Sequence, residues 1–380
     1  MNQRILFYCQ HLLGIGHLRR AVTLARGLAD GGFDVTLVSG GEAVPNLELH
    51  GLKFEQLDPV RAVDKFFKVL VDSNGTVIDD AFKMRRRDSL LALFAKLKPD
   101  LVLTEMFPFG RRQLRFELLP LLDAAKAAKV KVASSVRDIL VSAPKPERIE
   151  EMIGLIETYY DAVLVHSDPR LIPFDRTFAP AQRFADRLRY TGYVVEGSTP
   201  DRGANAPGKG EVLVSAGGGA VAEPLLEAAM AAKPNTALAG RRWRLLVGHN
   251  LPEDRFRALQ AKADGNTVVE RARPDFTTLL ANAELSISQG GYNTVMETIK
   301  FGHRAVVSPY AGGLETEQTL RAALLAERGL IHIVDETTLS AATLADAIER
   351  ALAAPPIDAA SLFNLDGLNT TVDIVRDLLQ

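Results

Sequence analysis

The stretch Ser288-Gln-Gly-Gly-Tyr-Asn-Thr-Val-Met-Glu297 decides the fold class of this chain. It follows a short apolar run, residues 285–288, that predicts a buried strand, and it opens a run over residues 295–301 that predicts a helix ending at Gly302. A strand, a glycine pair and a helix start form an anion site, because glycine lets the backbone approach closely and free helical N–H groups point at negative charge. Glu297 lies about one turn into the helix, where its carboxylate could accept hydrogen bonds from ribose hydroxyls. The stretch therefore suggests a nucleotide ligand.

Length and composition indicate a globular enzyme with two domains. The chain has 380 residues, of which 47% are apolar and 24% charged, and its net charge of −2 gives no case for nucleic-acid binding. The single cysteine, Cys9, excludes an internal disulfide framework and a cysteine-clustered zinc site, so a reducing compartment fits. The sequence shows no signal peptide and no run of about 18 apolar residues. We therefore expect a cytoplasmic protein, and a peripheral contact with the inner face of the membrane stays open.

Short apolar strands alternate with longer amphipathic helices in both halves of the chain. Strands without polar alternation, separated by helices, predict parallel sheets covered on both faces. We therefore expect an α/β protein made of two Rossmann-like, doubly wound domains. The expected strands are residues 5–9, 35–39, 101–105, 130–135 and 162–165 in the first half, and 212–215, 245–247, 267–269, 285–288, 305–308 and 331–334 in the second.

A stretch rich in glycine, proline and small polar residues separates the two halves. Residues 196–210 have the composition of a linker. We expect a first domain over residues 1–195, a second over residues 211–360, and a final helix within residues 361–380 that packs back on the first domain. Ligands of such folds bind at the carboxyl ends of the strands, here expected in the cleft between the domains.

Three glycine-bearing turns follow predicted strands. They are Gln10-His-Leu-Leu-Gly-Ile-Gly-His-Leu-Arg-Arg20, Ser215-Ala-Gly-Gly-Gly219 and the stretch from Ser288 to Glu297. Any one of them could be only a tight turn, whereas three at strand ends favour a ligand site. None contains the Gly-Lys-Ser/Thr of a phosphate-binding P-loop, and Arg19 occupies the third glycine position of the dinucleotide fingerprint. This argues against a nicotinamide enzyme.

His17 is a candidate general base. It starts the first predicted helix directly after a Gly-x-Gly turn, and an unperturbed imidazole suits proton abstraction at neutral pH. A histidine that only caps the helix is the alternative; we favour the functional role because the loop should face the ligand. Glu105 ends another predicted strand and could be the base instead, could orient His17, or could only cap a turn.

Together these residues resemble the GT-B glycosyltransferases, and among them the MurG-like family of UDP-N-acetylglucosaminyltransferases. The resemblance covers both domains and is strongest over residues 267–329. It implies a UDP-sugar as donor substrate, no cofactor and no metal site, since helix dipoles and N–H groups stabilise the leaving diphosphate. It also implies direct displacement by an acceptor hydroxyl, which inverts the anomeric configuration.

The resemblance places the donor on the second domain. Asn293 and Thr294 would face the diphosphate, and Glu297 would bind the ribose. The backbone around Arg273 would read uracil, while Glu317 and Gln318 would bind the sugar hydroxyls, although the helix dipole alone also favours acidic residues in a first turn. The complete set of expected donor-binding residues is Gly16, Ser215, Gly217, Gly218, Arg273, Gly290, Gly291, Asn293, Thr294, Glu297, Glu317 and Gln318.

The first domain would supply the catalytic residues His17 and Glu105 and would bind the acceptor. Arg137 and Asp138 follow a predicted strand and are expected on the acceptor side, although each could equally be a satisfied polar group at a strand end. The basic cluster at residues 85–87 is expected to be a solvated helix face, which could also meet an anionic acceptor or lipid headgroups.

We therefore expect a metal-independent, inverting glycosyltransferase that moves a hexose from a UDP-sugar to an acceptor hydroxyl. The acceptor could be a small molecule, a glycan or a lipid-linked sugar. Two alternatives stay open. One is a UDP-sugar 2-epimerase on the same fold, with Glu105 and Asp138 serving an elimination; the other is a nucleotide-sugar-binding partner subunit without chemistry of its own.

Overall fold

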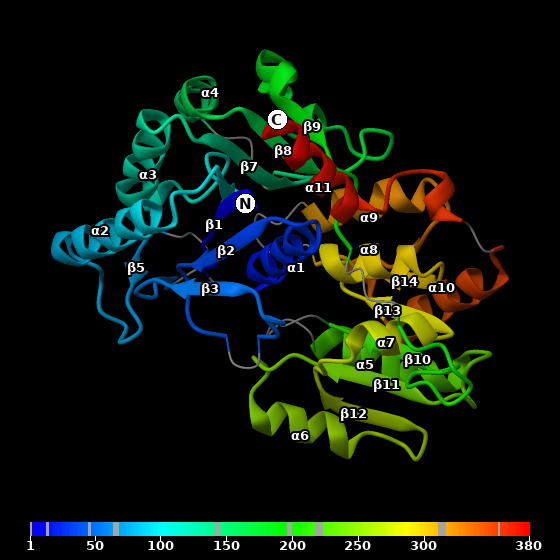
Figure 1. The fold of residues 1–380 in the computed structure, drawn as a ribbon. Coiled ribbons are helices and arrows are strands. Elements are labelled where there is room, and N and C mark those ends of the chain that lie inside the picture. Colours follow the sequence, from blue (N-terminus) through cyan, green and yellow to red (C-terminus); the bar gives the residue numbers. More distant parts are fainter. Residues whose placement is uncertain are drawn as a thin grey trace. The chain divides into compact units, whose positions relative to one another are not determined.

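The computed structural model describes residues 2–12, 15–44, 47–63, 68–140, 145–195, 200–216, 223–310, 317–355 and 358–380. These residues form two compact units (Figure 1). The first unit comprises Met1–Val194 together with Asp366–Gln380, and the second comprises Val195–Leu365. The first unit is thus built from two separate parts of the chain.

The first unit contains a seven-stranded parallel sheet. Its strands, in spatial order, are β3 (Lys53–Gln56), β2 (Asp34–Ser39), β1 (Arg4–Cys9), β6 (Leu101–Glu105), β7 (Lys131–Arg137), β8 (Ala162–His166) and β9 (Leu188–Tyr190). Strands β4 (Arg61–Ala62) and β5 (Leu70–Val71) form a separate antiparallel pair. The helices are α1 (Gly16–Asp30), α2 (Asp80–Leu97), α3 (Arg115–Ala127), α4 (Pro146–Tyr159) and α11 (Gly367–Leu378), with 3₁₀ turns η1 (Arg112–Leu114), η2 (Phe174–Arg176) and η3 (Ala179–Arg187).

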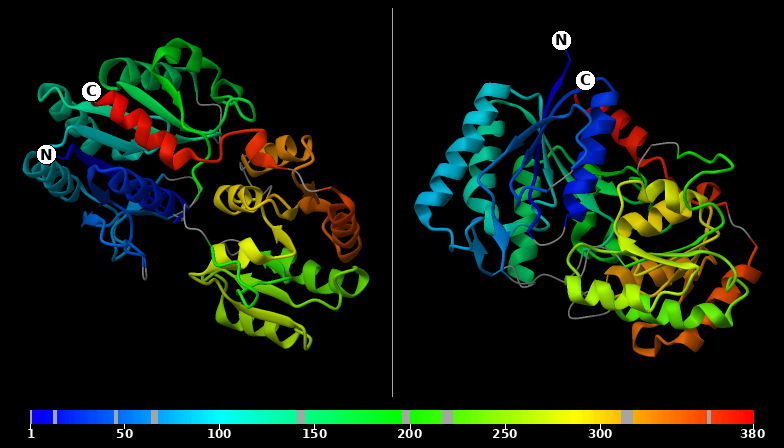
Figure 2. Two further views of the ribbon diagram at one scale, coloured as in Figure 1. Left: turned by 45° about the vertical axis from the view of Figure 1, so that its right-hand side comes forward. Right: turned by 90° about the horizontal axis from the view of Figure 1, so that it is seen from below.

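Alternate side chains of each strand point to opposite faces of this sheet, and each face has its own helices. Leu6 and Tyr8 of β1 pack in a core with α2, α3 and α4, whereas Ile5 and Phe7 pack in a core with α1 and α11. Helices α1 and α11 contact each other and lie side by side in both views of Figure 2.

The second unit repeats this plan with a six-stranded parallel sheet. Its strands, in spatial order, are β12 (Thr267–Arg271), β11 (Trp243–Val247), β10 (Val212–Ser215), β13 (Leu285–Ser288), β14 (Arg304–Val307) and β15 (His332–Ile333). The helices are α5 (Glu223–Ala232), α6 (Glu253–Ala261), α7 (Phe276–Asn282), α8 (Tyr292–Lys300), α9 (Glu317–Ala326) and α10 (Ala341–Ala353), with 3₁₀ turns η4 (Lys233–Asn235), η5 (Glu336–Thr338) and η6 (Ala359–Ser361).

The predicted fold class, two doubly wound parallel α/β sheets, is confirmed. In each sheet the strand order reverses at one place, between β1 and β6 in the first and between β10 and β13 in the second. The helices that follow the two strands of such a pair lie on opposite faces, so the connecting loops diverge. Ligands of open α/β sheets bind at this switch point, beyond the carboxyl ends of the strands.

The strands that the sequence did not predict are mostly edge strands. Residues of Lys53–Gln56 and Leu188–Tyr190 are half-buried or exposed, so neither strand has the apolar run that marks a buried strand. Helix α2 starts at Asp80, because the Asp79 carboxylate accepts a hydrogen bond from the Phe82 N–H at 2.7 Å and caps the helix there.

The segment expected to be a linker lies on the second unit over its described part, residues 200–210. This part contains no helix or strand, yet the Asn282 amide donates to the Asp201 carbonyl oxygen at 2.7 Å. Gly208 has a positive φ of 84°, and a Cβ there would lie 2.5 Å from the Leu279 carbonyl oxygen. Glycine is therefore required where the segment crosses α7. Separately, none of the helices in the described ranges has the length and apolar content to cross a membrane.

Candidate functional site

His17 and Glu105 meet at the switch point of the first sheet. His17 is the second residue of α1, which follows β1, and Glu105 is the last residue of the neighbouring strand β6. The His17 Nδ1 and Glu105 Oε1 atoms are 2.9 Å apart. The Glu105 side chain is completely buried, whereas 22% of the His17 side chain is exposed. The two predicted catalytic residues therefore lie in direct contact, with His17 the one that solvent can reach.

The charges around the pair fix its protonation state. Burial alone would raise the pKa of Glu105, but Arg20, His17 and Ser135 outweigh it and hold that pKa well below its ordinary value. Burial and the charge of Arg111 lower the pKa of His17 to about 3. An ionised carboxylate can only accept, so the His17 proton lies on Nδ1 and Nε2 keeps its lone pair. This neutral tautomer is the one that a general base needs.

The buried histidines predict a loss of stability in mild acid. Burial, and next the charge of Arg20, lower the pKa of His166 to about 3, as burial does for His17, while an unfolded histidine titrates near 6.5. Below about pH 6.5 the unfolded chain binds protons that the folded chain does not, so the free energy of unfolding should fall as the pH is lowered. Each histidine contributes a slope of at most about 1.4 kcal/mol per pH unit. Urea unfolding of wild type and His166→Gln between pH 7.5 and 5 checks this; parallel curves for the two proteins would refute the role of His166.

Three polar residues outside the predicted catalytic pair join Glu105 in one network. The Arg20 guanidinium pairs with Glu105 Oε1, and the Ser135 hydroxyl lies 2.7 Å from Oε2. His166 Nε2 lies 2.8 Å from the same Ser135 oxygen. A signal existed for each: Arg20 is one turn beyond His17 on the same helix, and the other two lie near the carboxyl ends of strands β7 and β8.

The predicted acceptor-side residues lie next to each other at the end of β7. Arg137 is the last residue of the strand and is half-buried. Asp138 is completely buried, and its carboxylate accepts a hydrogen bond from the Ile139 N–H at 3.0 Å. A buried carboxylate that accepts from its own loop is typical of a strand-end support, and the acceptor-side role of both residues stays a prediction.

The prediction that residues 85–87 form a solvated helix face is wrong for Arg86. Its side chain is completely buried, and its Nε lies 2.6 Å from Glu117 Oε2. The same guanidinium donates to Gln10 Oε1 at 2.6 Å and to the Gly40 carbonyl oxygen at 2.8 Å. Gln10 and Gly40 directly follow β1 and β2, so Arg86 ties both strand ends to α2 and α3. Only one residue of the cluster, Arg85, is fully exposed.

The switch point of the second sheet carries the start of α8. Ser215 and Ser288, the last residues of β10 and β13, are register partners there. Gly290 has a φ of 86°, and a Cβ there would lie 2.8 Å from Val307 Cγ1, so the turn requires glycine. The N-cap of α8 is Gly291, and no side chain caps the helix. Gly291 has no side chain that could occupy the place of an anion at the start of α8.

Most of the remaining predicted donor-binding residues lie near the starts of α8 and α9. Asn293, Thr294 and Glu297 are half-buried in the first two turns of α8. Gln318 Oε1 accepts from the Tyr310 N–H at 3.1 Å and lies 3.9 Å from the position of a Cβ on Gly290. The structure thus brings the glycine turn, α8 and the start of α9 together. Gly16 is the first residue of α1, and Gly217 and Gly218 lie outside the described residues.

Glu317 and Arg273 both hold ion pairs. Glu317 is buried, and its Oε1 lies 2.5 Å from Arg321 Nη2; the Arg321 guanidinium in turn lies 5.1 Å from the ring centre of Tyr292, the first residue of α8. Arg273 donates to both carboxylate oxygens of Asp275, at 2.8 and 2.7 Å. Their roles with sugar and base stay predictions, because each side chain already has an ionic partner within the protein.

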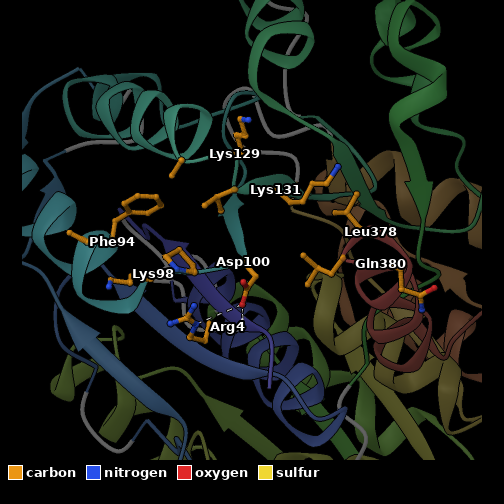
Figure 3. A pocket seen from close by; sticks show the side chains of 13 residues that line it. Arg4, Phe94, Lys98, Asp100, Lys129, Lys131, Leu378 and Gln380 are labelled. Atoms are coloured by element: carbon orange, nitrogen blue, oxygen red, sulfur yellow. Dashed lines mark hydrogen bonds and ion pairs between the residues drawn. The ribbon is translucent and has the colours of Figure 1, made fainter. Parts of the chain in front are cut away.

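A cavity of about 500 Å³ opens elsewhere on the first unit (Figure 3). Its lining includes Arg4 at the start of β1, Asp100 just before β6 and Lys131 at the start of β7, with Leu378 of α11 beside them. It therefore lies at the amino ends of the strands, whereas His17 and Glu105 lie at the carboxyl ends. This cavity is not the predicted acceptor site.

Comparison with known proteins agrees with this geometry. Residues 212–361 match the glycosyltransferase family 28 C-terminal domain. The crystal structure of MurG from Acinetobacter baumannii superposes with a TM-score of 0.58 and 16% identity, covering 100% of this chain and 99% of that one. The chain is a glycosyltransferase with the GT-B fold. The resemblance stated from the sequence is thereby confirmed.

Other relatives of this GT-B glycosyltransferase differ in how much of the chain they match. An uncharacterized glycosyltransferase of Methanosarcina acetivorans is 22% identical over 88% of this chain and 86% of its own length. The UDP-N-acetylglucosamine–N-acetylmuramyl-(pentapeptide) pyrophosphoryl-undecaprenol N-acetylglucosamine transferase of Paraburkholderia xenovorans is 40% identical, but over only 19% of each chain. The spinosyn rhamnosyltransferase SpnG, solved with thymidine diphosphate, superposes over 100% of both chains with a TM-score of 0.64 and 19% identity.

Proposed function

We propose that this glycosyltransferase moves a hexose from a UDP-sugar to an acceptor hydroxyl, with inversion at the anomeric carbon and without a metal ion. The observation that carries the proposal is the contact between His17 and the ionised Glu105, 2.9 Å apart at the switch point of the first sheet. The glycine turn and the start of α8 at the switch point of the second sheet support a diphosphate donor.

The proposed chemistry assigns one task to each unit. The acceptor hydroxyl gives its proton to His17 Nε2, and its oxygen attacks the anomeric carbon while the bond from that carbon to the diphosphate oxygen breaks. UDP leaves with the electron pair, and the N–H groups and dipole of α8 stabilise its negative charge. Glu105 stabilises the imidazolium that forms, as the carboxylate of a catalytic triad does. A single displacement of this kind inverts the anomeric carbon.

Burial favours the transferase over the 2-epimerase. An epimerase on this fold would use Glu105 and Asp138 as acid and base against the sugar. Both side chains are completely buried, and Glu105 already accepts from Arg20, Ser135 and His17. His17 is the member of the pair that a substrate hydroxyl can reach.

The proposal of a UDP-sugar rather than a dTDP-sugar rests on the 2′-hydroxyl of the ribose. The Paraburkholderia relative is named for a UDP-sugar, whereas SpnG was solved with thymidine diphosphate. Only uridine carries a 2′-hydroxyl, so a carboxylate that accepts from both ribose hydroxyls would prefer UDP. Glu297, half-buried in the second turn of α8, is the residue to which we assign this task.

Calorimetric titration with UDP-glucose, UDP-galactose, UDP-N-acetylglucosamine and the matching dTDP-sugars tests the proposal. The UDP-sugars should bind more tightly than the dTDP-sugars, and activity on the preferred donor should survive EDTA. Tighter binding of the dTDP-sugars would overturn the nucleotide assignment. Loss of activity on chelation, restored by Mg²⁺ or Mn²⁺, would overturn the metal-free mechanism. Conversion of the preferred UDP-sugar to its 2-epimer without acceptor would favour the epimerase.

Glu297→Ala should weaken UDP binding by about 1.5–3 kcal/mol, the contribution of a hydrogen bond to a charged group. The variant should also lose most of the preference for UDP over dTDP, because the 2′-hydroxyl then has no acceptor. Titration of both nucleotides measures the two effects. Glu227→Ala, which removes an exposed carboxylate from α5, is the control. A folded Glu297→Ala protein with wild-type UDP affinity would sink the assignment.

Gln318→Ala should raise the donor KM or lower kcat while leaving the affinity for free UDP unchanged. The reason is that an amide beside the Gly290 turn can both donate to and accept from sugar hydroxyls. Gln318→Glu is the matched variant, since a carboxylate still accepts from the Tyr310 N–H and only the donor is lost. If free UDP binding falls as much as donor binding, Gln318 serves the nucleotide site rather than the sugar.

A further inference from the structure

A chain of buried hydrogen bonds extends from Glu105 away from His17. Ser135 Oγ lies 2.7 Å from Glu105 Oε2 and 2.8 Å from His166 Nε2. His166 Nδ1 lies 2.9 Å from Thr191 Oγ1. All four side chains are completely buried. They come from the ends of β6, β7 and β8 and from the residue after β9, so the chain crosses four neighbouring strands of the first sheet.

The ionised Glu105 carboxylate favours one donor-to-acceptor direction for this series of hydrogen bonds. Glu105 carries no proton, so the hydrogen bond between Ser135 and Oε2 exists only when the Ser135 hydroxyl donates it. The Ser135 oxygen then accepts from His166, which places the His166 proton on Nε2. Thr191 completes the order by donating to the bare Nδ1. Every donor therefore points toward Glu105, and charge-assisted hydrogen bonds of this kind are the strong ones.

The same atoms also permit the opposite hydrogen-bond direction, in which Glu105 has one donor fewer. If His166 carried its proton on Nδ1, the Thr191 oxygen would accept from it, and the Thr191 hydroxyl would donate a hydrogen bond to the Gly192 carbonyl oxygen, 2.8 Å away. Ser135 would then donate to His166 Nε2, and Glu105 Oε2 would lose this donor. The carboxylate could rotate away from His17, with Arg20 as its remaining charged partner at Oε1. The His166 tautomer is thus coupled to the orientation of Glu105.

We propose that Ser135 and His166 are positioning residues for His17: Ser135 holds the second oxygen of Glu105, and His166 aims the Ser135 hydroxyl, so that Oε1 keeps the His17 proton on Nδ1. The inference rests on the proposed function, in which His17 Nε2 is the base. Neither residue touches the substrate in this scheme. Both act through Glu105.

The neighbouring residue Ser134 provides a matched control. It lies in the same strand, is equally buried, and its hydroxyl donates to the Phe107 carbonyl oxygen at 2.8 Å instead of to the carboxylate. Ser134→Ala and Ser135→Ala therefore each remove one buried hydroxyl from β7, with one hydrogen bond lost at Ser134 and two at Ser135. Only Ser135→Ala removes a donor from Glu105.

The direct test is the tautomer of His17, read from its ¹⁵N chemical shifts in the whole chain without any ligand. The wild-type protein and Ser134→Ala should show the Nδ1–H tautomer alone, whereas Ser135→Ala should show a mixture. Ser135→Thr, which keeps the hydroxyl, should restore the single tautomer. Identical His17 spectra for Ser134→Ala and Ser135→Ala would overturn the proposal.

A second pair of variants addresses His166 and does not depend on the folding of Ser135→Ala. His166→Gln keeps an N–H donor near the position of Nε2 and should leave the His17 tautomer as in wild type. His166→Leu has no donor there and should give the mixture. The same tautomer in both would overturn the role of His166.

Hydrolysis of UDP-N-acetylglucosamine, in which water takes the sugar and UDP is released, separates this inference from the proposed function. If His17→Ala abolishes the release, Ser135→Ala should lower its kcat about tenfold with little change in KM, while Ser134→Ala should not. If His17→Ala releases UDP as wild type does, the base assignment fails. The ¹⁵N spectra then still decide whether Ser135 and His166 set the His17 tautomer.

Discussion

Replacing His17 by alanine is expected to lower turnover about 10²–10⁴-fold, the usual contribution of a general base, while UDP binding stays almost intact. The reason is that His17 lies in the first unit, at the start of α1, whereas Glu297 and the start of α8, to which UDP binding is assigned, lie in the second. Steady-state kinetics with the preferred donor, together with calorimetric titration of UDP, measures the two quantities separately.

His50→Ala is the control for this prediction, because His50 belongs to the same unit and its exposed side chain pairs with the exposed Glu48. It should keep wild-type turnover. Near-normal turnover of His17→Ala at saturating substrate would show that the base lies elsewhere. Glu105 would then be the first residue to test, by Glu105→Gln.

Glu117→Ala is expected to destabilise the first unit by about 3–5 kcal/mol, because it leaves the Arg86 guanidinium buried without its carboxylate. Both side chains are completely buried, and Glu117 also accepts from the Tyr8 hydroxyl. The loss is a large share of the stability of an ordinary domain. Urea unfolding, monitored by hydrogen exchange of the amides in β1 and β6, measures this loss of stability in the first unit.

The single tryptophan supplies an internal reference for that experiment. Trp243 lies in β11 of the second unit, so its fluorescence follows the unfolding of that unit. Glu150→Ala, which breaks an exposed pair with Arg183, should leave both signals nearly unchanged. Glu117→Ala with the urea midpoint of wild type in the first unit would show that the buried pair contributes little.

The sequence predicted the buried parts of the fold because apolar runs mark strands that are covered on both faces. For Glu105 it left three roles open, and the contact with His17 that the structure shows is the one in which Glu105 orients the histidine. It could not predict that Arg86 is buried, because the composition of a helix face does not show that a carboxylate such as Glu117 lies opposite. The network of Arg20, Ser135 and His166 depends on contacts across strands, which spacing along the chain does not give.

The discontinuous first unit has a consequence for synthesis on the ribosome. Helix α11 closes the face of α1: a Cβ on Gly31 would lie 2.6 Å from Val372, and Val375 belongs to the same buried core. Residues 366–380 emerge only after all of 195–365 has been made. Until then the nascent first unit lacks the cover over the end of α1 around Gly27 and Gly31, while the second unit, which is continuous, is free to fold. Chaperones that bind exposed apolar surface will meet this protein at α1.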